Sequence, residues 1–361
     1  MNEVGQARRE HLTRRQALTL LGEVLGGAAL LAACGRKAIP PAEPAPVAVT
    51  TTKVEPVTTA PRPALFPLTG RPVDDPARAT RPALTIKIDN APAARPQSGL
   101  DAADVVFEEV VEGGVVRFAA IFHSSDAGSI GPVRSVRAED AVLVTPLRGY
   151  FVYSGGNDIF NAIIQKAPVG LINEDGPPGL LTRRRDRRQP FNLYTSTGTI
   201  YGQAPKRDEV PPELFSFRPA GQPLGGGAGP AREVNVTMGE RTTLVWSYDD
   251  ASGRWLRTTN GTPHVVEGGA RLSFPNVVIQ FCRYQPTGVI DASGSNSPEA
   301  VLVGDGEVWV LSGPALAKGR WAKLNPAAVT TYVDGAGKPL LLQPGATWVV
   351  LAPVGAPTGV R

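Results

Sequence analysis

Two β-rich runs joined by a pair of glycines constrain this chain more than any other feature. The runs cover residues 105–112 and 115–123, and the glycine pair at 113–114 is a strong signal for a two-residue β-hairpin turn. Because side chains alternate between the faces of a strand, such a turn places Arg117 diagonally opposite Glu108. The sequence therefore predicts a sheet with charged side chains on one of its faces.

A third alternating run precedes the hairpin, at residues 84–90. Its apolar side chains share one side and its polar side chains the other, which is typical of a half-buried strand. If the three runs belong to one sheet, a single face gathers both signs of charge. This predicted mixed-charge face consists of Lys87, Asp89, Glu108, Glu112 and Arg117.

The length of the chain, 361 residues, is too great for one hydrophobic core and predicts two domains with extensions. Residues 66–218 contain the hairpin and are expected to form a mixed α/β domain. Capping residues and amphipathic patterns predict that helices flank its β-sheet, at 135–145, 159–166 and 197–203.

A stretch rich in Gly and Pro, residues 219–231, is the predicted linker to the second domain. Residues 232–353 show short strand patterns separated by turn signals, which predict a mostly β domain. The last segment, 354–361, is expected to be a disordered tail. The predicted fold class is therefore α+β: a mixed α/β domain with flanking helices, followed by a mostly β domain.

The N-terminal segment has the features of an exported lipoprotein. Residues 1–33 combine four arginines with an apolar run too short to span a membrane permanently, as a signal peptide does. They end in Leu-Ala-Ala before Cys34, which resembles a bacterial lipidation site. We expect diacylglycerol on the Cys34 thiol, palmitate among the acyl chains, and an extracytoplasmic protein lipid-anchored to the cell membrane.

Residues 34–65, rich in Pro and Thr, form the predicted tether. The arginine pair in the leader leaves open twin-arginine export as well as the general secretory route.

Composition narrows the classes of partner and chemistry. The net charge is +4, too small to argue for a nucleic-acid partner, and none is expected. With Cys34 assigned to lipidation, Cys282 stands alone and is expected to be buried and inert. Only His123 and His264 lie outside the leader, so we expect no metal site and no cofactor. Catalytic residues stay unknown, since the sequence shows no hydrolase nucleophile elbow, metalloprotease motif or P-loop.

Several sequence blocks carry a family resemblance. They are KIDN at 87–90, ARPQSGL at 94–100, GPVRS at 131–135, YSGGN at 153–157 and FNLYTST at 191–197. Together with blocks in the second domain, they resemble the YerB-like envelope lipoprotein family, whose function is unknown. The resemblance implies a two-domain α/β architecture and an anchored, extracytoplasmic location. It supplies no catalytic residues.

Arginines near the mixed-charge face make an anion site the first hypothesis. Arg134 precedes a predicted helix, at a position where anions are favoured and a cation is otherwise unfavourable. We therefore expect a binding or assembly factor whose cleft near Arg134 recognises an anionic envelope ligand or an envelope protein. The predicted ligand-binding residues are Arg134, Arg137, Arg117, Lys87, Asp89, Asn90, Glu108, Glu112 and Asn157.

Two alternatives use the same residues. In the first, Asp89, Glu108 and Glu112 hold a divalent cation while arginines clamp a phosphate, as in a metal-assisted phosphoryl-transfer or glycan-processing enzyme of the envelope. In the second, the charges only pair with one another, and Arg117 bridges the two glutamates of the hairpin.

Overall fold

The computed structural model describes residues 64–290 and 294–361, which belong to one compact unit. The predicted signal peptide, Cys34 and all but the last two residues of the predicted tether lie outside the described residues.

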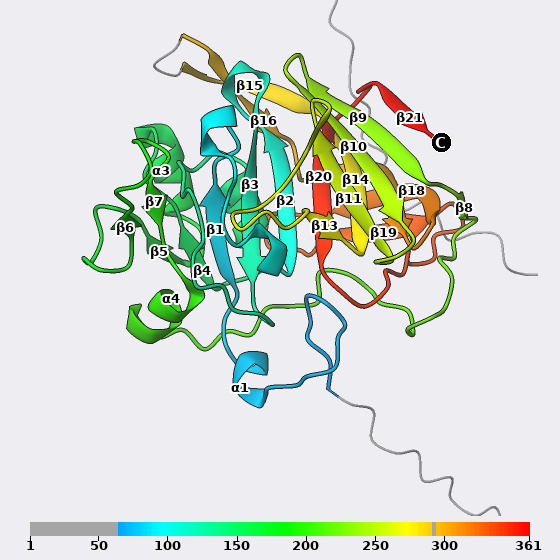
Figure 1. Cartoon of the computed structure of the whole chain (residues 1–361), viewed down its shortest axis with the longest axis horizontal. Helices are drawn as coiled ribbons and strands as arrows, with labels where there is room; N and C mark the ends of the chain where they lie inside the picture. The colour runs from blue at the N-terminus through cyan, green and yellow to red at the C-terminus, as the bar shows by residue number, and fades with distance from the viewer. Residues whose placement is uncertain (1–63, 291–293) are drawn as a thin grey trace, which may run out of the picture. The chain divides into compact units, whose positions relative to one another are not determined.

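A large mixed sheet runs through the described residues, and both predicted domains contribute strands to it (Figure 1). In the centre, β2 lies parallel to β20, with Val105 beside Thr347. The two regions therefore share one sheet, and even the predicted linker adds a short strand to it. The 11 strands, in spatial order, are β19 (Thr331–Asp334), β18 (Ala315–Lys323), β17 (Gly304–Ser312), β14 (Asn276–Cys282), β20 (Thr347–Pro353), β2 (Val105–Val110), β3 (Val116–Phe122), β1 (Leu84–Ile88), β4 (Tyr150–Val152) and β5 (Gly170–Ile172), with β8 (Gly229–Pro230) beside β18.

The predicted hairpin forms, but its turn has three residues, Glu112–Gly114 (η3), in place of two. Val110 pairs with Val116, and Glu109 pairs with Arg117. The expected register is therefore wrong by one residue. Because side chains alternate along a strand, this one-residue shift exchanges the two faces of β3 relative to β2.

A second, antiparallel sheet lies over one face of the central sheet (Figure 1). Its long strands alternate buried and less buried residues, as expected for a sheet with one face in the core. Its six strands are β12 (Thr262–Pro263), β11 (Arg254–Thr259), β10 (Thr242–Asp249), β9 (Glu233–Gly239), β21 (Thr358–Val360) and β13 (Ser273–Phe274). Two short pairs complete the strands of the described residues: β15 (Tyr284–Ile290) with β16 (Asn296–Ala300), and β6 (Thr182–Arg183) with β7 (Leu193–Tyr194).

The C-terminal segment is ordered, in contrast to the disordered tail expected at 354–361. Its strand β21 pairs antiparallel with β9, and Val360 lies beside Val234. The N–H groups of Arg232 and Glu233 both donate to the carbonyl of Arg361, at 2.7 and 3.0 Å. The edge of β9 would otherwise expose unpaired backbone groups, and the tail satisfies them.

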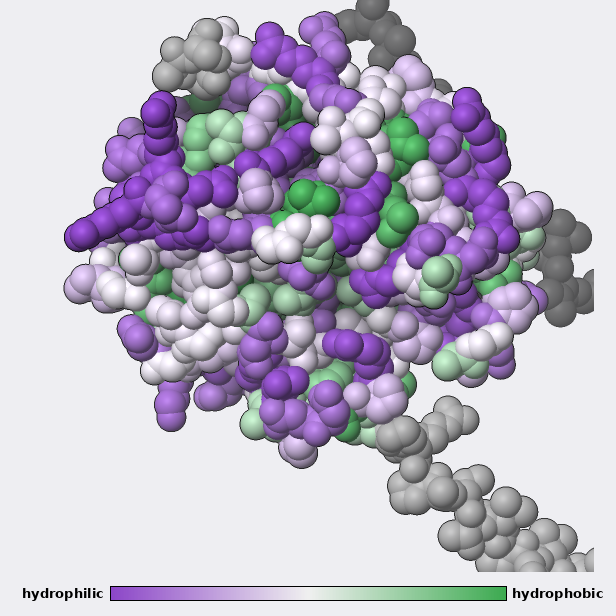
Figure 2. Space-filling model, viewed as in Figure 1, coloured by the Kyte–Doolittle hydropathy of each residue, from purple (hydrophilic) through white to green (hydrophobic). Residues whose placement is uncertain are grey.

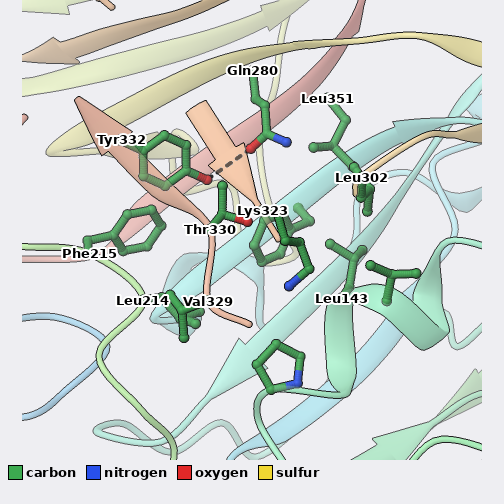
Figure 3. Close-up of a pocket in the computed structure, with 13 residues that line it drawn as sticks. Leu143, Leu214, Phe215, Gln280, Leu302, Lys323, Val329, Thr330, Tyr332 and Leu351 are labelled. Atoms are coloured by element: carbon green, nitrogen blue, oxygen red, sulfur yellow. Dashed lines mark hydrogen bonds between the residues drawn. The ribbon is translucent and has the colours of Figure 1, made fainter. Parts of the chain in front are cut away.

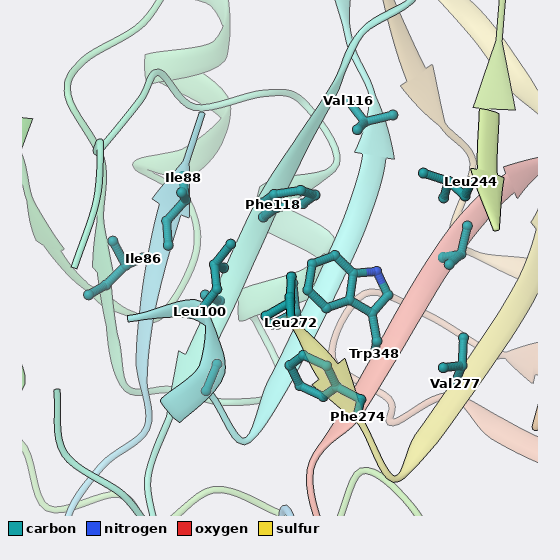
Figure 4. Packing of buried hydrophobic residues seen from close by; sticks show 14 of the residues in the cluster. Ile86, Ile88, Leu100, Val116, Phe118, Leu244, Leu272, Phe274, Val277 and Trp348 are labelled. Carbon is teal, nitrogen blue, oxygen red and sulfur yellow. The ribbon is translucent and has the colours of Figure 1, made fainter. Parts of the chain in front are cut away.

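The main core lies between the two sheets, around Trp348 of β20 (Figure 4). The indole is fully buried, and its ring centre lies 5.0 Å from that of Phe118 and 5.2 Å from that of Phe274, both in edge-to-face geometry. Each large apolar side chain buried in this way stabilises the fold by about 1.5–3 kcal/mol. Because Phe118 comes from the first region and Phe274 from the second, this core holds the two regions together.

The helices are few and short, so the fold is mostly β with an α+β character. The predicted second and third helices are confirmed as α3 (Asp158–Ile164) and α4 (Thr197–Gln203), and Ser196 caps the latter through the N–H of Thr199 at 3.0 Å. The first, predicted at 135–145, is shorter. It begins at Asp140 (α2, Asp140–Val144), since the residues before it pair with strands instead. The other short helices are α1 (Pro76–Ala79), η1 (Pro92–Ala94) and η2 (Leu100–Ala102).

Candidate functional site

The central sheet carries buried charges on both of its faces. Lys87 lies opposite Ala119, and Arg117 opposite Glu109, so these charged side chains share one face. Glu108 pairs with Phe118 and points to the other face, toward the second sheet. The predicted mixed-charge face is therefore wrong for Glu108, because the three-residue turn reversed the alternation.

Lys87 is the cation of the first buried cluster. Its Nζ donates to a carboxylate oxygen of Glu109 and, at 2.8 Å, to Oδ1 of Asp140. Burial alone lowers the pKa of Lys87, but the charges of Asp140 and Glu109 outweigh it and raise that pKa. The cluster thus keeps its lysine protonated in a fully buried position.

Two carboxylates near Lys87, those of Glu109 and Glu139, hold protons more tightly than usual. Burial raises the pKa of Glu109 to about 7, against the opposing effect of Lys87. Glu139 is fully buried, and neither of its carboxylate oxygens has a hydrogen-bond partner among the described residues. Burial and the nearby charge of Glu109 raise the pKa of Glu139 well above its ordinary value. Both effects favour the neutral, protonated form of Glu139.

Three arginines form a second cluster beside the first, and the chain path explains how Arg134 reaches it. The segment before α2 runs between the carboxyl ends of β1 and β4. The N–H of Arg134 donates to the carbonyl of Lys87 at 2.9 Å, and its carbonyl accepts from the N–H of Ser154 at 3.0 Å. Its guanidinium lies 2.8 Å from Oδ2 of Asp89 and over the ring of Phe191, and the side chain is 26% exposed.

Arg117 and Arg137 lie deeper than Arg134. Arg137 donates to Oε2 of Glu112 at 2.6 Å, and Ser297 donates to the other oxygen of that carboxylate at 2.6 Å. Among the described residues, the one hydrogen-bond acceptor of Arg117 is the carbonyl of Ser135, at 3.3 Å. The two clusters touch at Asp140, because its Oδ2 accepts from the backbone N–H of Arg137 at 2.7 Å while its Oδ1 accepts from Lys87.

The arginine cluster, Arg117, Arg134 and Arg137, has more positive than negative charge. Its carboxylate partners are Asp89 and Glu112, which leaves 3 − 2 = +1 on these paired groups. The adjoining Lys87 cluster carries 1 − 2 = −1 when Glu109 and Asp140 are both ionised, so the positive excess is local to the guanidinium groups. Burial and the charge of Arg137 lower the pKa of Arg117 to about 10. The buried Nε atoms of Arg117 and Arg137 have no hydrogen-bond partner among the described residues. A bound anion would supply the missing acceptor and the missing charge.

The side-chain oxygens of Asn90 and Asn157, two residues also predicted to bind ligand, have structural partners. Oδ1 of Asn90 accepts from Nε of Arg95 and from Nε2 of Gln97, both at 2.9 Å. Oδ1 of Asn157 accepts from the N–H of Ile159 at 2.9 Å and caps α3. The structure therefore brings together Lys87, Asp89, Glu112 and the three arginines, and separates Glu108 from them.

On the opposite face, Glu108 joins the two regions of the chain. Its Oε1 accepts from Nη2 of Arg257 at 2.5 Å, and its Oε2 accepts from Nε1 of Trp348 at 2.8 Å. Arg257 also donates to Nδ1 of His264, whose Nε2 lies 2.9 Å from Oε1 of Gln97. Burial and the charge of Arg257 lower the pKa of His264 to about 2. The imidazole is therefore neutral, and its Nε2–H donates to Gln97, which belongs to the first region of the chain.

A second cationic region opens beside this network. A cavity of about 180 Å³ is lined by Arg95, Thr259, Thr262 and His264 together with apolar neighbours. Arg95 keeps one side of its guanidinium on Asn90. This cavity belongs to the opposite side of the sheet from the arginine cluster, so the two can be tested separately.

The basic run at 182–188 lies at the surface, where Figure 2 shows hydrophilic side chains gathered over the part of the molecule that carries β6 and β7. Arg183 pairs with Glu174 at 2.6 Å, and Arg184 pairs with Glu267 at 2.7 Å. Exposed ion pairs of this kind contribute about 0–1 kcal/mol each. The run is therefore a paired surface loop.

Sequence reasoning missed Glu109, Arg257 and Gln97 as members of these networks. The signal was a pair of adjacent acidic residues, Glu108 and Glu109, inside a strand whose flanks are apolar. Adjacent residues of a strand point to opposite faces, so each of the two buried glutamates needs a cationic partner on its own face of the sheet.

Two further searches concern the described residues alone. Across residues 64–290 and 294–361, no helix is long and apolar enough to cross a bilayer. Over the same ranges, no three or more His, Cys, Asp or Glu side chains are grouped so that they could hold a metal ion.

Comparisons with known proteins identify similar sequences and a similar structure. Residues 68–210 match the N-terminal domain, and residues 234–349 the C-terminal domain, of a family described as "Protein of unknown function (DUF3048)". Over 300 residues the chain is 29% identical to the "Putative lipoprotein YerB" of Bacillus subtilis (strain 168). The matched residues make up 80% of the chain and 86% of that relative. A crystal structure of the YerB protein from Bacillus subtilis superimposes with a TM-score of 0.70 at 25% identity, over 82% of the chain and 99% of that structure. The resemblance predicted from the sequence blocks is confirmed.

Proposed function

The chain belongs to the DUF3048 family, and on that premise we propose that it is a membrane-anchored extracytoplasmic lipoprotein that binds an anionic ligand or partner of the cell envelope. Binding takes place at the arginine cluster, Arg117, Arg134 and Arg137. The anchor is the lipidated Cys34, and the tether that follows holds the folded unit away from the bilayer.

The observation that supports this function is a largely buried group of three guanidinium groups with two carboxylate partners. Arg117 is only 9% exposed and, within the part of the chain that the structure describes, donates to a single carbonyl. Buried guanidinium groups are normally paired with carboxylates or other anions, since an unpaired buried charge is strongly unfavourable. Arg134 is the most exposed member and would meet the ligand first. A phosphate or carboxylate group fits the planar, forked donors of arginine.

Inorganic pyrophosphate is a suitable probe for this site, because it tests the charge and geometry without assuming a ligand. Binding is measured by isothermal titration calorimetry on the full chain at constant ionic strength, with chloride in the reference titration. Arg134→Gln should weaken binding about tenfold or more, since a charge-assisted hydrogen bond contributes about 1.5–3 kcal/mol. Native mass spectrometry of the purified full chain then identifies any anionic ligand it retains.

Arg95→Gln is the matched control, because it removes the same group from the cationic cavity on the opposite face of the sheet. It should leave pyrophosphate binding at the arginine cluster unchanged. Loss of binding in Arg95→Gln together with retention in Arg134→Gln would place the anion site at the other cavity and reject the proposal. Equal, non-saturable heats in all three proteins would also reject it.

A further inference from the structure

An apolar groove with a lysine at its base opens on the face of the central sheet that points away from the second sheet (Figure 3). The floor comes from β2 and β20, and the walls come from α2, the segment before residue 217 and the turn before β19. The inner cavity, beside Lys323, has a volume of about 30 Å³. A second cavity of about 240 Å³, called here the outer part, shares Leu214, Phe215, Val329 and Tyr332 with it as lining residues. The apolar lining of the inner cavity includes Leu143, Leu214, Phe215, Leu302, Val329 and Tyr332.

Lys323 is a buried cation without a buried anion. The residue is 5% exposed, and its Nζ donates to the carbonyl of Ala328. In the part of the chain that the structure describes, no carboxylate lies within 4 Å of this ammonium group. Burial lowers the pKa of Lys323 to about 8. A lysine in such surroundings is unfavourable unless an anionic group joins it.

Two other polar residues of the groove, Tyr332 and Gln280, already have partners. The hydroxyl of Tyr332 donates to Oε1 of Gln280 at 2.9 Å, and the amide nitrogen of Gln280 faces the sulfur of Cys282. Among the described residues that line the inner part of the groove, Lys323 carries the one charged side chain, and it is the group that would meet an anionic ligand. At the outer end the lining includes Glu213, which is exposed. The groove is therefore positive inside, apolar along its length and negative at its rim.

We propose that this groove binds a single aliphatic chain that ends in a carboxylate, a ligand of the fatty-acid class, with the carboxylate on Lys323. The charge order fixes the orientation, because Glu213 repels a carboxylate at the outer end. The outer volume of 240 Å³ equals about eight water volumes at about 30 Å³ each, which suits a chain of about eight to ten carbons rather than a protein surface. The inference goes beyond the proposed function and does not depend on the arginine cluster.

Decanoate, used below its micelle concentration, tests the proposal by calorimetry on the full chain carrying Cys34→Ala, so that no attached lipid competes. Lys323→Met keeps the length of the side chain and removes its charge. This substitution should weaken decanoate binding about tenfold or more. Decanol, which lacks the carboxylate, should bind the groove with Lys323 present as weakly as decanoate binds Lys323→Met. Lys318→Met is the matched control, because Lys318 lies on the same strand but is exposed. It should bind decanoate normally.

The pH dependence gives a second signature. Lys323 loses its proton above its pKa, so decanoate affinity should fall between about pH 8 and pH 10, and Lys323→Met should not show this fall. Equal affinity of Lys323→Met and the parent chain would overturn the proposal, as would equal affinity for decanol and decanoate.

A direct measurement remains decisive even if Lys323→Met fails to fold. A decanoate derivative with a photoreactive diazirine at its tail, irradiated with the otherwise unaltered Cys34→Ala chain, should label groove residues such as Leu214 and Val329. Arg134→Gln should leave this labelling unchanged, which separates the inference from the proposed function. Labelling spread over other surfaces, without saturation by unlabelled decanoate, would overturn the assignment.

Discussion

Glu108 and Glu109 are neighbours in the sequence, yet they neutralise cations on opposite faces of the same strand. Glu108 pairs with Arg257 beneath the second sheet, and Glu109 pairs with Lys87 beside α2. All four side chains are fully buried. These two adjacent residues of β2 therefore link the two sheets on one face. On the other face they stabilise α2 and the arginine cluster beside it.

Glu108→Gln should be strongly destabilising, because it leaves Arg257 buried without a carboxylate. Breaking a buried ion pair in this way costs about 3–5 kcal/mol. Glu109→Gln should cost less, since Lys87 keeps Asp140 at 2.8 Å. Urea unfolding followed by tryptophan fluorescence measures both, with Trp348 as a reporter beside Glu108.

The control for this pair is Glu240→Gln, at an exposed position without an ion pair among the described residues. Its free energy of unfolding should stay within about 0.5 kcal/mol of that of the parent chain. If Glu108→Gln were as stable as Glu240→Gln, the buried pair would not hold the two sheets together.

Local patterns predicted the strands and helices whose signals lie within a few residues. The alternation at 84–90 predicted β1, and the polar residues before 197 predicted the cap of α4, which Ser196 provides. The hairpin was also predicted, but its register was not. Glu112 enters the turn in the structure, and nothing in a pair of glycines reveals that a third residue will join it.

The partners of the buried charges lie too far away in the sequence for local reasoning. Arg257 is separated from Glu108 by 149 positions, and Ser297 from Glu112 by 185. Such pairs depend on how β2 meets β20 and on how the second sheet covers the first. The sequence showed that charges gather near the hairpin, but only the fold determines which face each one occupies.

Glu139→Gln should raise stability relative to the parent chain as the pH increases. The pKa of Glu139 is raised in the folded state, so folding takes up a proton above pH 4.5 and becomes less favourable as the pH rises toward the folded pKa. Glutamine takes up no proton. The difference in unfolding free energy between the two proteins should therefore grow by up to about 1.4 kcal/mol per pH unit in that window.

Urea titrations at pH 5, 6, 7 and 8 measure this difference. Glu240→Gln, at an exposed position, provides a reference whose difference from the parent chain should stay constant. A constant difference for Glu139→Gln as well would mean that Glu139 is ionised in the folded protein.

His123 should make the protein less stable in acid. The imidazole is fully buried, and neither ring nitrogen has a hydrogen-bond partner among the described residues. Burial lowers its pKa from 6.5 to about 4, so its contribution to stability is present above pH 6.5 and is lost as the pH falls toward 4. The loss should be of the order of 2–3 kcal/mol. His123→Leu, of similar volume, should remove this part of the acid dependence, as measured by thermal unfolding between pH 4 and pH 7.

A contrary result for His123→Leu would be an unchanged slope of stability against pH in that range. Glu109 and Glu139 give the opposite sign, because their raised pKa values favour the folded state in acid. Combining His123→Leu with Glu139→Gln should therefore flatten the dependence at both ends of the range.

Cys34→Ala should release the protein from membranes, since the thiol is the proposed site of the acyl chains. Each buried methylene of an acyl chain contributes about 0.8 kcal/mol to anchoring, and two or three chains make it stable. In a detergent phase-partition assay the parent chain should enter the detergent phase and Cys34→Ala the aqueous phase.

Cys282→Ala is the matched control, because Cys282 is fully buried and burial raises its pKa to about 12, so it cannot carry lipid. It should partition like the parent chain. Retention of Cys34→Ala in the detergent phase would show that something other than lipid on this cysteine attaches the protein to the membrane.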